Sequence, residues 1–331
     1  MLTRFIDFCR KKLFASWLDS LLSLLSIGLI AWILFSFLHW ALAEADWSVI
    51  YSSLRFLMAG GLEATELWRA WVGGLIFVLL TGLSLVHILR IRRLNIAWLS
   101  VAWVVGTIIM WNILIPSNGR AVGGLLLGTL VTIVAAIASF PLGVLLALGR
   151  NSRLPGIRIV CTTYIELVRS LPLISILFWA WMVVPLILPA DLRINDIVRG
   201  AAGFTLFYAA YVAEYVRGGL QGIPAGQWSA ARSLGMKQVQ TLRYIVLPQA
   251  IRSVLPGLVG NVLDIFNNVP LLFIIGLTEF VRAGQVVLSN PQHSDQLYEV
   301  YIFMFAVYLL IATVLSWSSR IVERNASATK F

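Results

Sequence analysis

The sequence has very little charge for its length. Only 12% of its 331 residues are Asp, Glu, Lys or Arg, whereas a soluble domain carries about 25%. Hydrophobic residues make up 60%, and they come in runs long enough to cross the hydrocarbon layer as helices of about 20 residues. This pattern excludes an ordinary soluble globular protein. We predict an all-α polytopic membrane protein.

Cysteine and histidine are also scarce. The two cysteines, Cys9 and Cys161, both fall toward the cytoplasm in the topology given below, where disulfides are rare. The three histidines stand far apart, and no His, Cys, Asp or Glu cluster has the spacing of a metal site. We therefore expect no disulfide framework, no metal and no cofactor on this chain.

Motifs for catalysis and nucleotide binding are missing as well. No segment reads G-x-x-x-x-G-K-[ST], the loop that holds nucleotide phosphates. No segment reads G-x-S-x-G, the turn that presents a serine nucleophile. We predict that the chain is not an enzyme. If it drives uphill transport, another subunit must supply the energy.

The apolar runs predict about eight transmembrane helices. The first follows a basic N-terminus and is too long for the 7–15-residue core of a signal peptide, so we expect it to stay uncleaved. The predicted spans are about 21–42, 68–89, 97–115, 121–148, 160–189, 200–217, 250–278 and 299–319.

The distribution of charge supports this count. If the N-terminus is cytoplasmic, 19 of the 25 lysines and arginines fall on the inner side. Cytoplasmic loops of membrane proteins carry such an excess of cations. The acidic segment with Glu44, Asp46, Glu63 and Glu66 falls on the outer side. The pattern therefore predicts an N-terminus, a 218–249 loop and a C-terminus that all lie in the cytoplasm.

The loop at 218–249 is the longest polar-containing interval in the second half of the chain. Pro224 is suited to open a short helix, since its missing N–H would be unpaired there. Gly235 is suited to end that helix in the left-handed conformation. A patch of small residues, Ala230 and Ala231, lies between them, and a second amphipathic helix follows up to Pro248. An ordinary cytoplasmic loop remains one interpretation, and a helix that docks into a partner's groove is the other.

Three separated motifs in this region resemble a known family. The loop QWSAARSLGM followed by LRYIVLPQA is similar to the coupling loop of permease subunits in binding-protein-dependent ABC importers. YIELVRSLPLI at 164–174 and YVAEYVRGGLQGIP at 211–224 fit the polar amino-acid branch of that family. The resemblance covers roughly residues 123–320. It implies that the last five spans form a type I importer permease core.

The resemblance assigns contact with the ATPase to the loop. The residues implied are Pro224, Gly226, Gln227, Trp228, Ser229, Ala230, Ala231, Leu234, Gly235, Leu247 and Pro248. Ser229 stands where relatives usually carry a glutamate, so this chain departs from the pattern at one position.

The family motifs also suggest how the chain is divided. We expect an N-terminal extension with three spans at 1–116, a permease domain at 121–320 and a cytoplasmic tail at 321–331. No family motif lies in the first three spans.

Two charged pairs lie close to the cytoplasmic ends of spans. Glu166 and Arg169 are three residues apart, as are Glu214 and Arg217, so each pair shares one helical face. Local neutralisation is one interpretation. The other is that these residues brace the loop and pass its movement to the helices.

Two amides lie inside an apolar span. Asn267 and Asn268 precede Pro270, where the family usually has a different polar segment. An amide within a span can bond a neighbouring helix or line the path of a polar solute. Both interpretations stay open.

The resemblance implies a function and partners. The chain is expected to be a permease subunit of an ATP-driven importer for polar amino acids, in the inner membrane of a bacterium. Its partners would be a second, homologous permease, two ATP-binding subunits that hold ATP and Mg, and an extracytoplasmic binding protein. The alternative is an ATP-independent secondary transporter or channel, although we find no internal repeat of the kind that such proteins show.

Overall fold

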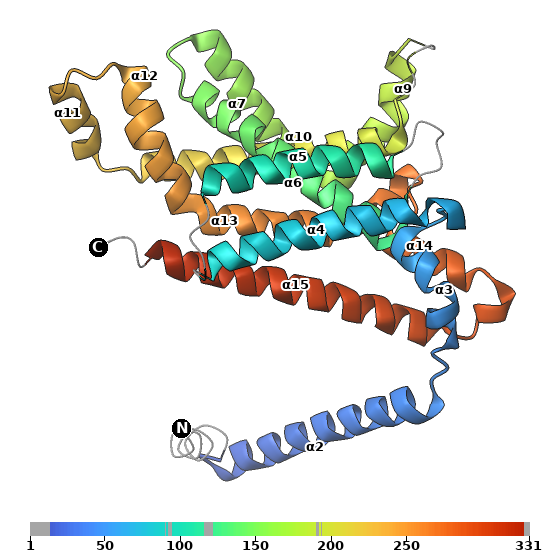
Figure 1. Ribbon diagram of the computed structural model, residues 1–331. Helices are drawn as coiled ribbons and strands as arrows, with labels where there is room; N and C mark the ends of the chain where they lie inside the picture. The colour runs from blue at the N-terminus through green and yellow to red at the C-terminus, as the bar shows by residue number, and fades with distance from the viewer. Residues whose placement is uncertain are drawn as a thin grey trace.

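The computed structural model describes residues 14–89, 91, 95–115, 122–189, 192 and 194–327, and this part of the chain is helical throughout (Figure 1). The only extended pairing among these residues is an isolated bridge between Gly124 and Glu279. The first half contains α2 (Trp17–His39), η2 (Trp40–Glu44), α3 (Ser48–Ala59), η3 (Ala64–Glu66), α4 (Leu67–Ile88), α5 (Ile96–Leu114) and α6 (Gly124–Arg150). The second half contains α7 (Pro155–Ser170), α8 (Leu173–Phe178), η4 (Trp179–Val183), α9 (Val184–Ile187), α10 (Asp196–Gln221), α11 (Ala225–Ser233), α12 (Gln238–Thr241), η5 (Leu242–Val246), α13 (Leu247–Asn268), η6 (Val269–Ile275), α14 (Phe280–Leu288), η7 (Pro291–His293) and α15 (Leu297–Ser327).

Within the described residues, six helical segments are long and apolar enough to cross a membrane, and a bent pair makes up to seven. The predicted all-α membrane fold is therefore confirmed, and the described residues contain six or seven candidate spans where the sequence predicted about eight. The six are Trp17–Glu44, Ala64–Ile88, Ile96–Leu114, Gly124–Arg150, Gln238–Ile275 and Leu297–Arg324. The predicted span at 200–217 lies within α10, a 26-residue helix whose composition is less apolar because it carries Asp196, Arg199, Glu214 and Arg217.

The predicted single span at 160–189 is wrong in one respect, because two helices at an angle of 107° replace it. The break falls at Leu171 and Pro172. Leu171 is extended, with φ −96° and ψ 142°. A proline disfavours the helical conformation of the residue before it, which explains why α7 ends here.

Prolines also account for two widened turns. The π-helical segments η4 and η5 end shortly before Pro185 and Pro248. A proline inside a helix lacks an N–H and crowds the carbonyl four residues earlier, so a wider turn relieves the clash. The carbonyl that Pro185 leaves without its helical partner belongs to Trp181, and the Arg199 guanidinium donates to it over 2.6 Å. This bond ties η4 to α10.

Helix α10 is the centre of the bundle and packs against α6, α7 and α13. In a bilayer the lipid is as apolar as a leucine side chain, so close packing rather than burial from water holds helices together. Gly143 of α6 provides such an approach, since a Cβ there would lie 2.5 Å from the Val212 side chain of α10. Gly128 approaches Val269 in the same way, at 2.8 Å. The Gly124–Gly128 pattern thus serves packing inside the bundle.

Three of the candidate spans lie before residue 116, in the region where the sequence predicts an extension. The region before residue 116 is not separate from the rest, because the short helix α3 between the first two spans packs on α6, α14 and α15, and Leu57 joins Phe280 in one buried cluster. Gly60 and Gly123 meet so closely that a Cβ on Gly60 would lie 2.4 Å from the Gly123 Cα. By contrast, no residue of α2 is buried. The expected boundary at 116–121 lies outside the described residues.

The two ends of the bundle differ in what they carry. Figure 1 shows α11, α12, the start of α2 and the end of α15 at one end, and α3, α9 and α14 at the other. We call these the inner and the outer end. The 218–249 loop therefore lies at the same end of the bundle as the start of α2 and the end of α15 (Figure 1).

Candidate functional site: a projecting loop and the helices behind it

The loop between α10 and α13 projects from the inner end of the bundle (Figure 1). Its short helix, α11, begins at Ala225, one residue after Pro224, which is the N-cap with φ −55° and ψ 139°. Gly235 ends it with φ +74°, as predicted. The Gly235 N–H donates to the Arg232 carbonyl over 2.9 Å, and the Met236 N–H to the Ala231 carbonyl over 3.1 Å. These two bonds form a Schellman motif, which satisfies carbonyls at the helix end.

The loop folds back on itself, and Ala231 lies inside the fold. Only 1% of Ala231 is exposed, because α11 packs against α12 and η5. The Gln249 amide reaches the Gln227 side-chain oxygen over 3.2 Å and also donates to the Ile245 carbonyl. The expectation that Ala231 belongs to an outward small-residue face is therefore wrong, because its side chain supports the loop's own packing. Ala230 does face outward.

The outward side of the loop carries exposed apolar side chains. Leu234 is 79% exposed, Val239 73% and Tyr244 64%. Ser229 is also exposed, and its hydroxyl donates to the Ala225 carbonyl. The sequence-based site did not include Val239 and Tyr244, because the sequence gives little sign that these two side chains are exposed. Val239 is three residues before the apolar Leu242, a spacing that suggests a buried face rather than an exposed one.

A cluster of five charged residues, which we call the inner ion cluster, connects α6, α7 and α10. Arg150 bonds Glu214 at 2.7 Å and Glu166 at 2.8 Å. Glu214 also pairs with Arg217 at 2.8 Å and with Arg169 at 3.3 Å. The predicted pair Glu214–Arg217 forms. The predicted pair Glu166–Arg169 does not, because Arg150 at the end of α6 reaches Glu166 and Arg169 turns to α10.

The cluster lies next to the loop along the chain. Arg217 donates to the Gln221 side-chain oxygen over 2.7 Å, and α10 ends at Gln221. Sequence reasoning missed Arg150, because its two partners lie 16 and 64 residues away. An arginine with two carboxylate partners on different helices can transmit movement between them, since both bonds are charge-assisted and short.

The two candidate path residues differ in their surroundings. The Asn268 amide donates to the Tyr208 hydroxyl of α10 over 3.1 Å and to the Asp264 carbonyl over 2.8 Å. Asn267 is exposed on the surface of α13. Asn268 therefore makes a bond between helices, and Asn267 faces away from the bundle core.

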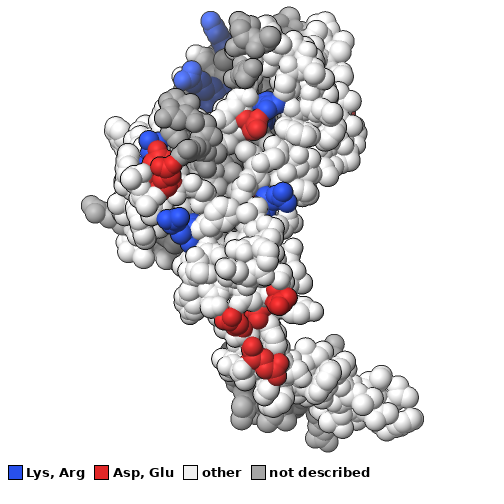
Figure 2. Space-filling model, turned by 90° about the vertical axis from the view of Figure 1, so that its right-hand side faces the viewer, with Lys and Arg blue, Asp and Glu red and all other residues white. Residues whose placement is uncertain are grey.

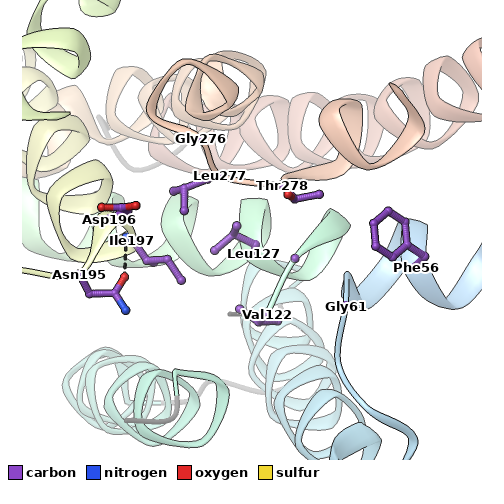
Figure 3. Close-up of a pocket in the computed structure, with 11 residues that line it drawn as sticks. Phe56, Gly61, Val122, Leu127, Asn195, Asp196, Ile197, Gly276, Leu277 and Thr278 are labelled. Atoms are coloured by element: carbon purple, nitrogen blue, oxygen red, sulfur yellow. Dashed lines mark hydrogen bonds between the residues drawn. The ribbon is translucent and has the colours of Figure 1, made fainter. Parts of the chain in front are cut away.

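A cavity of about 570 Å³ opens at the outer end (Figure 3). Its walls come from α3, α6, the start of α10 and the turn after η6. The residues that line it are Phe56, Gly61, Val122, Gly123, Leu127, Asn195, Asp196, Ile197, Gly276, Leu277 and Thr278. The Asn195 side chain is turned onto the Ile197 N–H, which caps α10. No residue of the predicted site lines this cavity.

The outer end is mixed in charge. Figure 2 looks onto this end and shows acidic side chains gathered near the part that carries α2. The Asp46 side chain binds Gln296, and the Asp46 N–H binds Glu299, so the segment before α3 is attached to α15. The bond that the Ser48 N–H donates to Asp46 lowers the pKa of that carboxyl. In the part of the chain that the structure describes, no group of three or more His, Cys, Asp or Glu residues could hold a metal ion.

Comparisons with known proteins agree with this architecture. Residues 139–327 match the family described as binding-protein-dependent transport system inner membrane component. The inner membrane amino-acid ABC transporter permease protein YhdY of Escherichia coli (strain K12) is 32% identical over 98% of this chain and 93% of its own length.

A shorter relative and a solved structure cover the second part of the chain. The glutamate/aspartate import permease protein GltK of Escherichia coli O6:H1 is 31% identical over 61% of this chain and 91% of its own length. A crystal structure of an amino acid ABC transporter with histidines matches 61% of this chain and 92% of that chain. Its TM-score is 0.55 and its sequence identity is 28%. The chain belongs to the family of multi-pass inner membrane components of binding-protein-dependent transport systems.

Proposed function

We propose that this chain is the permease subunit of an ATP-driven importer for polar amino acids. The amino-acid permeases among its relatives support the substrate class, because one is similar over 98% of the chain and another is a glutamate/aspartate import permease. The single observation that carries the mechanism is the projecting loop with its capped helix α11 and its exposed apolar side chains. Three large apolar side chains that are exposed on one short loop outside the spans are suited to contact with another protein.

The proposed docking surface is the outward side of this loop. It consists of Trp228, Ser229, Ala230, Leu234, Val239 and Tyr244. Its partner is an ATPase subunit on the cytoplasmic side, which binds ATP and Mg. Four further residues stabilise the conformation of the loop without contacting the ATPase: Ala231, Gly235, Leu247 and Pro248.

Movement passes from the loop to the bundle in two steps. When ATP closes the two ATPase subunits, the docked α11 helices are drawn together. The inner ion cluster then carries the displacement from α10 to α6 and α7, so that the spans shift from inward-open to outward-open. An extracytoplasmic binding protein delivers the amino acid to the outer end, and hydrolysis resets the complex.

The complex contains two permease chains. Ser229 replaces the glutamate usual at this position, so one charged contact with the ATPase is missing from this loop. We expect a homologous companion chain to supply it, which makes the two docking sites unequal.

Transport in proteoliposomes tests the function. We expect uptake of a radiolabelled amino acid only when the companion permease, the ATPase, the binding protein and ATP are all present. The alternative, a secondary transporter or channel, predicts uptake by this chain alone along an ion or solute gradient. Uptake without the ATPase would overturn the proposal.

A further inference from the structure

One partly exposed face of α13 is polar, although the helix lies in a span: Ser253, Asp264 and Asn267 on it are exposed. Ser253, Gly257, Gly260, Asp264 and Asn267 follow each other at steps of three and four, so they share one face. A Cβ added to Gly260 would meet no atom within 4 Å, which shows open space beside the helix. A face turned to lipid carries large apolar side chains. This face is suited to water or to a polar solute.

A row of tyrosines on α10 accompanies this face. Tyr208 bonds Asn268, and the Tyr215 ring lies 3.1 Å from the position of a Cβ on Gly257. Between them, Tyr211 lies under the Arg169 guanidinium, whose Cζ is 5.7 Å from the ring centroid. The two helices therefore form a polar lane that runs from Asn268 to the inner ion cluster.

Asp264 is the charged residue of this lane. Its side chain is exposed, and its carboxylate has no hydrogen bond or ion pair with any residue that the structure describes. A carboxylate inside a span is costly unless it meets a cation or water, and such residues mark the paths of substrates and ions. Tyrosine rings beside it would add attraction for a cation through their faces.

We propose that Asp264 holds the ammonium group of the transported amino acid during its passage, while the tyrosines of α10 form the wall beside it. This inference rests on the proposed function and adds to it a requirement on the substrate. An amino acid passes because it carries a cationic group, whatever its side chain. Asn267 lies one turn farther along the same face, within reach of the same solute.

The test uses the complete complex, with companion permease, ATPase and binding protein. The probes are radiolabelled L-glutamine, L-glutamate and L-arginine. Asp264→Asn should lower uptake of the transported probe at least tenfold, because a charge-assisted hydrogen bond is lost. The yield of assembled complex and the ATPase stimulation by loaded binding protein should stay unchanged. Asp264→Glu keeps the charge and should retain most uptake. Asp295→Asn removes the same charge at the outer end and should have no effect.

A second measurement separates binding from assembly. In the purified complex without binding protein, the dissociation constant of the probe should rise at least tenfold for Asp264→Asn. Unchanged uptake and unchanged binding would overturn the ammonium site and leave the proposed function standing. Failure of both the Asn and the Glu variants to assemble would also overturn it, because Asp264 would then pair with a cation of the companion chain. If the wild-type complex shows no ATP-dependent uptake of any probe, the proposed function fails first.

Discussion

At the residue scale, the loop depends on one backbone conformation. Gly235 has φ +74°, and a Cβ there would meet no atom within 4 Å. A side chain at this position is therefore opposed by the backbone alone and not by a clash. Sequence reasoning could predict this glycine, because the end of a helix has a local signal.

Replacing Gly235 should weaken ATPase binding in a graded way. Gly235→Ala should cost about 1 kcal/mol of loop stability, and Gly235→Val more, because a β-branched side chain resists positive φ strongly. Pull-down of the ATPase with the purified permease measures the effect. Gly218→Ala is the control, since Gly218 also has open space but lies in α10. Equal binding by Gly235→Val and Gly218→Ala would contradict this role.

Glu279 is a second residue that leads to a testable prediction, because its carboxyl group is buried. Its side chain is fully buried, and it accepts the N–H groups of Val281 and Arg282 at the start of α14. Burial raises the pKa of the Glu279 carboxyl to about 7, against hydrogen bonds that lower it. Arg282 is only three residues from Glu279, but its guanidinium binds the Gln285 side-chain oxygen over 3.1 Å.

The stability of the protein should therefore depend on pH near neutrality. The folded state binds the Glu279 proton more tightly than the unfolded state does, because the folded pKa lies above the usual value of 4.5. This contribution is fully present below about pH 4.5 and is lost as the pH rises through 7. The melting temperature of the purified complex should fall as the pH rises from 6 to 8. The Glu279→Gln variant should show a smaller dependence of melting temperature on pH. If the Glu279→Gln variant keeps the full dependence of melting temperature on pH, another titratable group causes this dependence.

At the scale of elements, contacts between helices were harder to predict than the helices themselves. Apolar runs and turn residues indicated most of the spans. The partner of Glu166 was not predictable, because Arg150 approaches it only when α6 and α7 are in place. Likewise, the break between α7 and α8 has a local cause at Pro172, but its angle depends on the packing against α10. The fold of the loop, which buries Ala231, also depends on contacts with η5.

Removing Arg150 should uncouple ATP hydrolysis from transport. Arg150→Met leaves Glu166 and Glu214 without their shared partner, so the amount of amino acid carried per ATP should fall on the order of fivefold. Arg150→Lys should keep part of the wild-type amount of amino acid carried per ATP, because a lysine keeps the charge but cannot bind both carboxylates with a planar fork. Uptake and phosphate release measured together give the ratio.

A control for this experiment is Arg158→Met. Arg158 is exposed on α7 and forms no ion pair with any residue in the described part of the chain. If Arg158→Met and Arg150→Met change the ratio alike, the inner ion cluster has no special part in coupling.

At the scale of the whole molecule, the N-terminal extension has two parts that differ in how they pack against the rest of the bundle. Helix α2 has no buried residue, whereas α3 shares a core with α14 and α15. The sequence indicated three spans without family motifs but not this difference, because burial against other helices leaves little trace in such uniformly apolar segments.

Two truncations separate these parts. A chain that begins at Asp46 lacks α2 and should assemble and melt like the full chain. A chain that begins at Ala121 also lacks α3, α4 and α5, and its melting temperature should be lower, because the cluster around Phe280 loses Leu57. Both should still pull down the ATPase in detergent if they stay folded, since the loop is intact. A folded Ala121 chain that binds no ATPase would contradict the separation of docking from the extension.

We infer that α11 is the mechanical contact with the ATPase, and crosslinking in the complete complex tests this contact. Single cysteines at Ser233 and in the groove of the ATPase are placed in an otherwise cysteine-free, transport-active complex, with Ser152 in another inner turn as the comparison site. We expect a crosslink from position 233 in the presence and absence of ATP, and none from position 152. A complex that transports but crosslinks through position 152 and not through position 233 would contradict it.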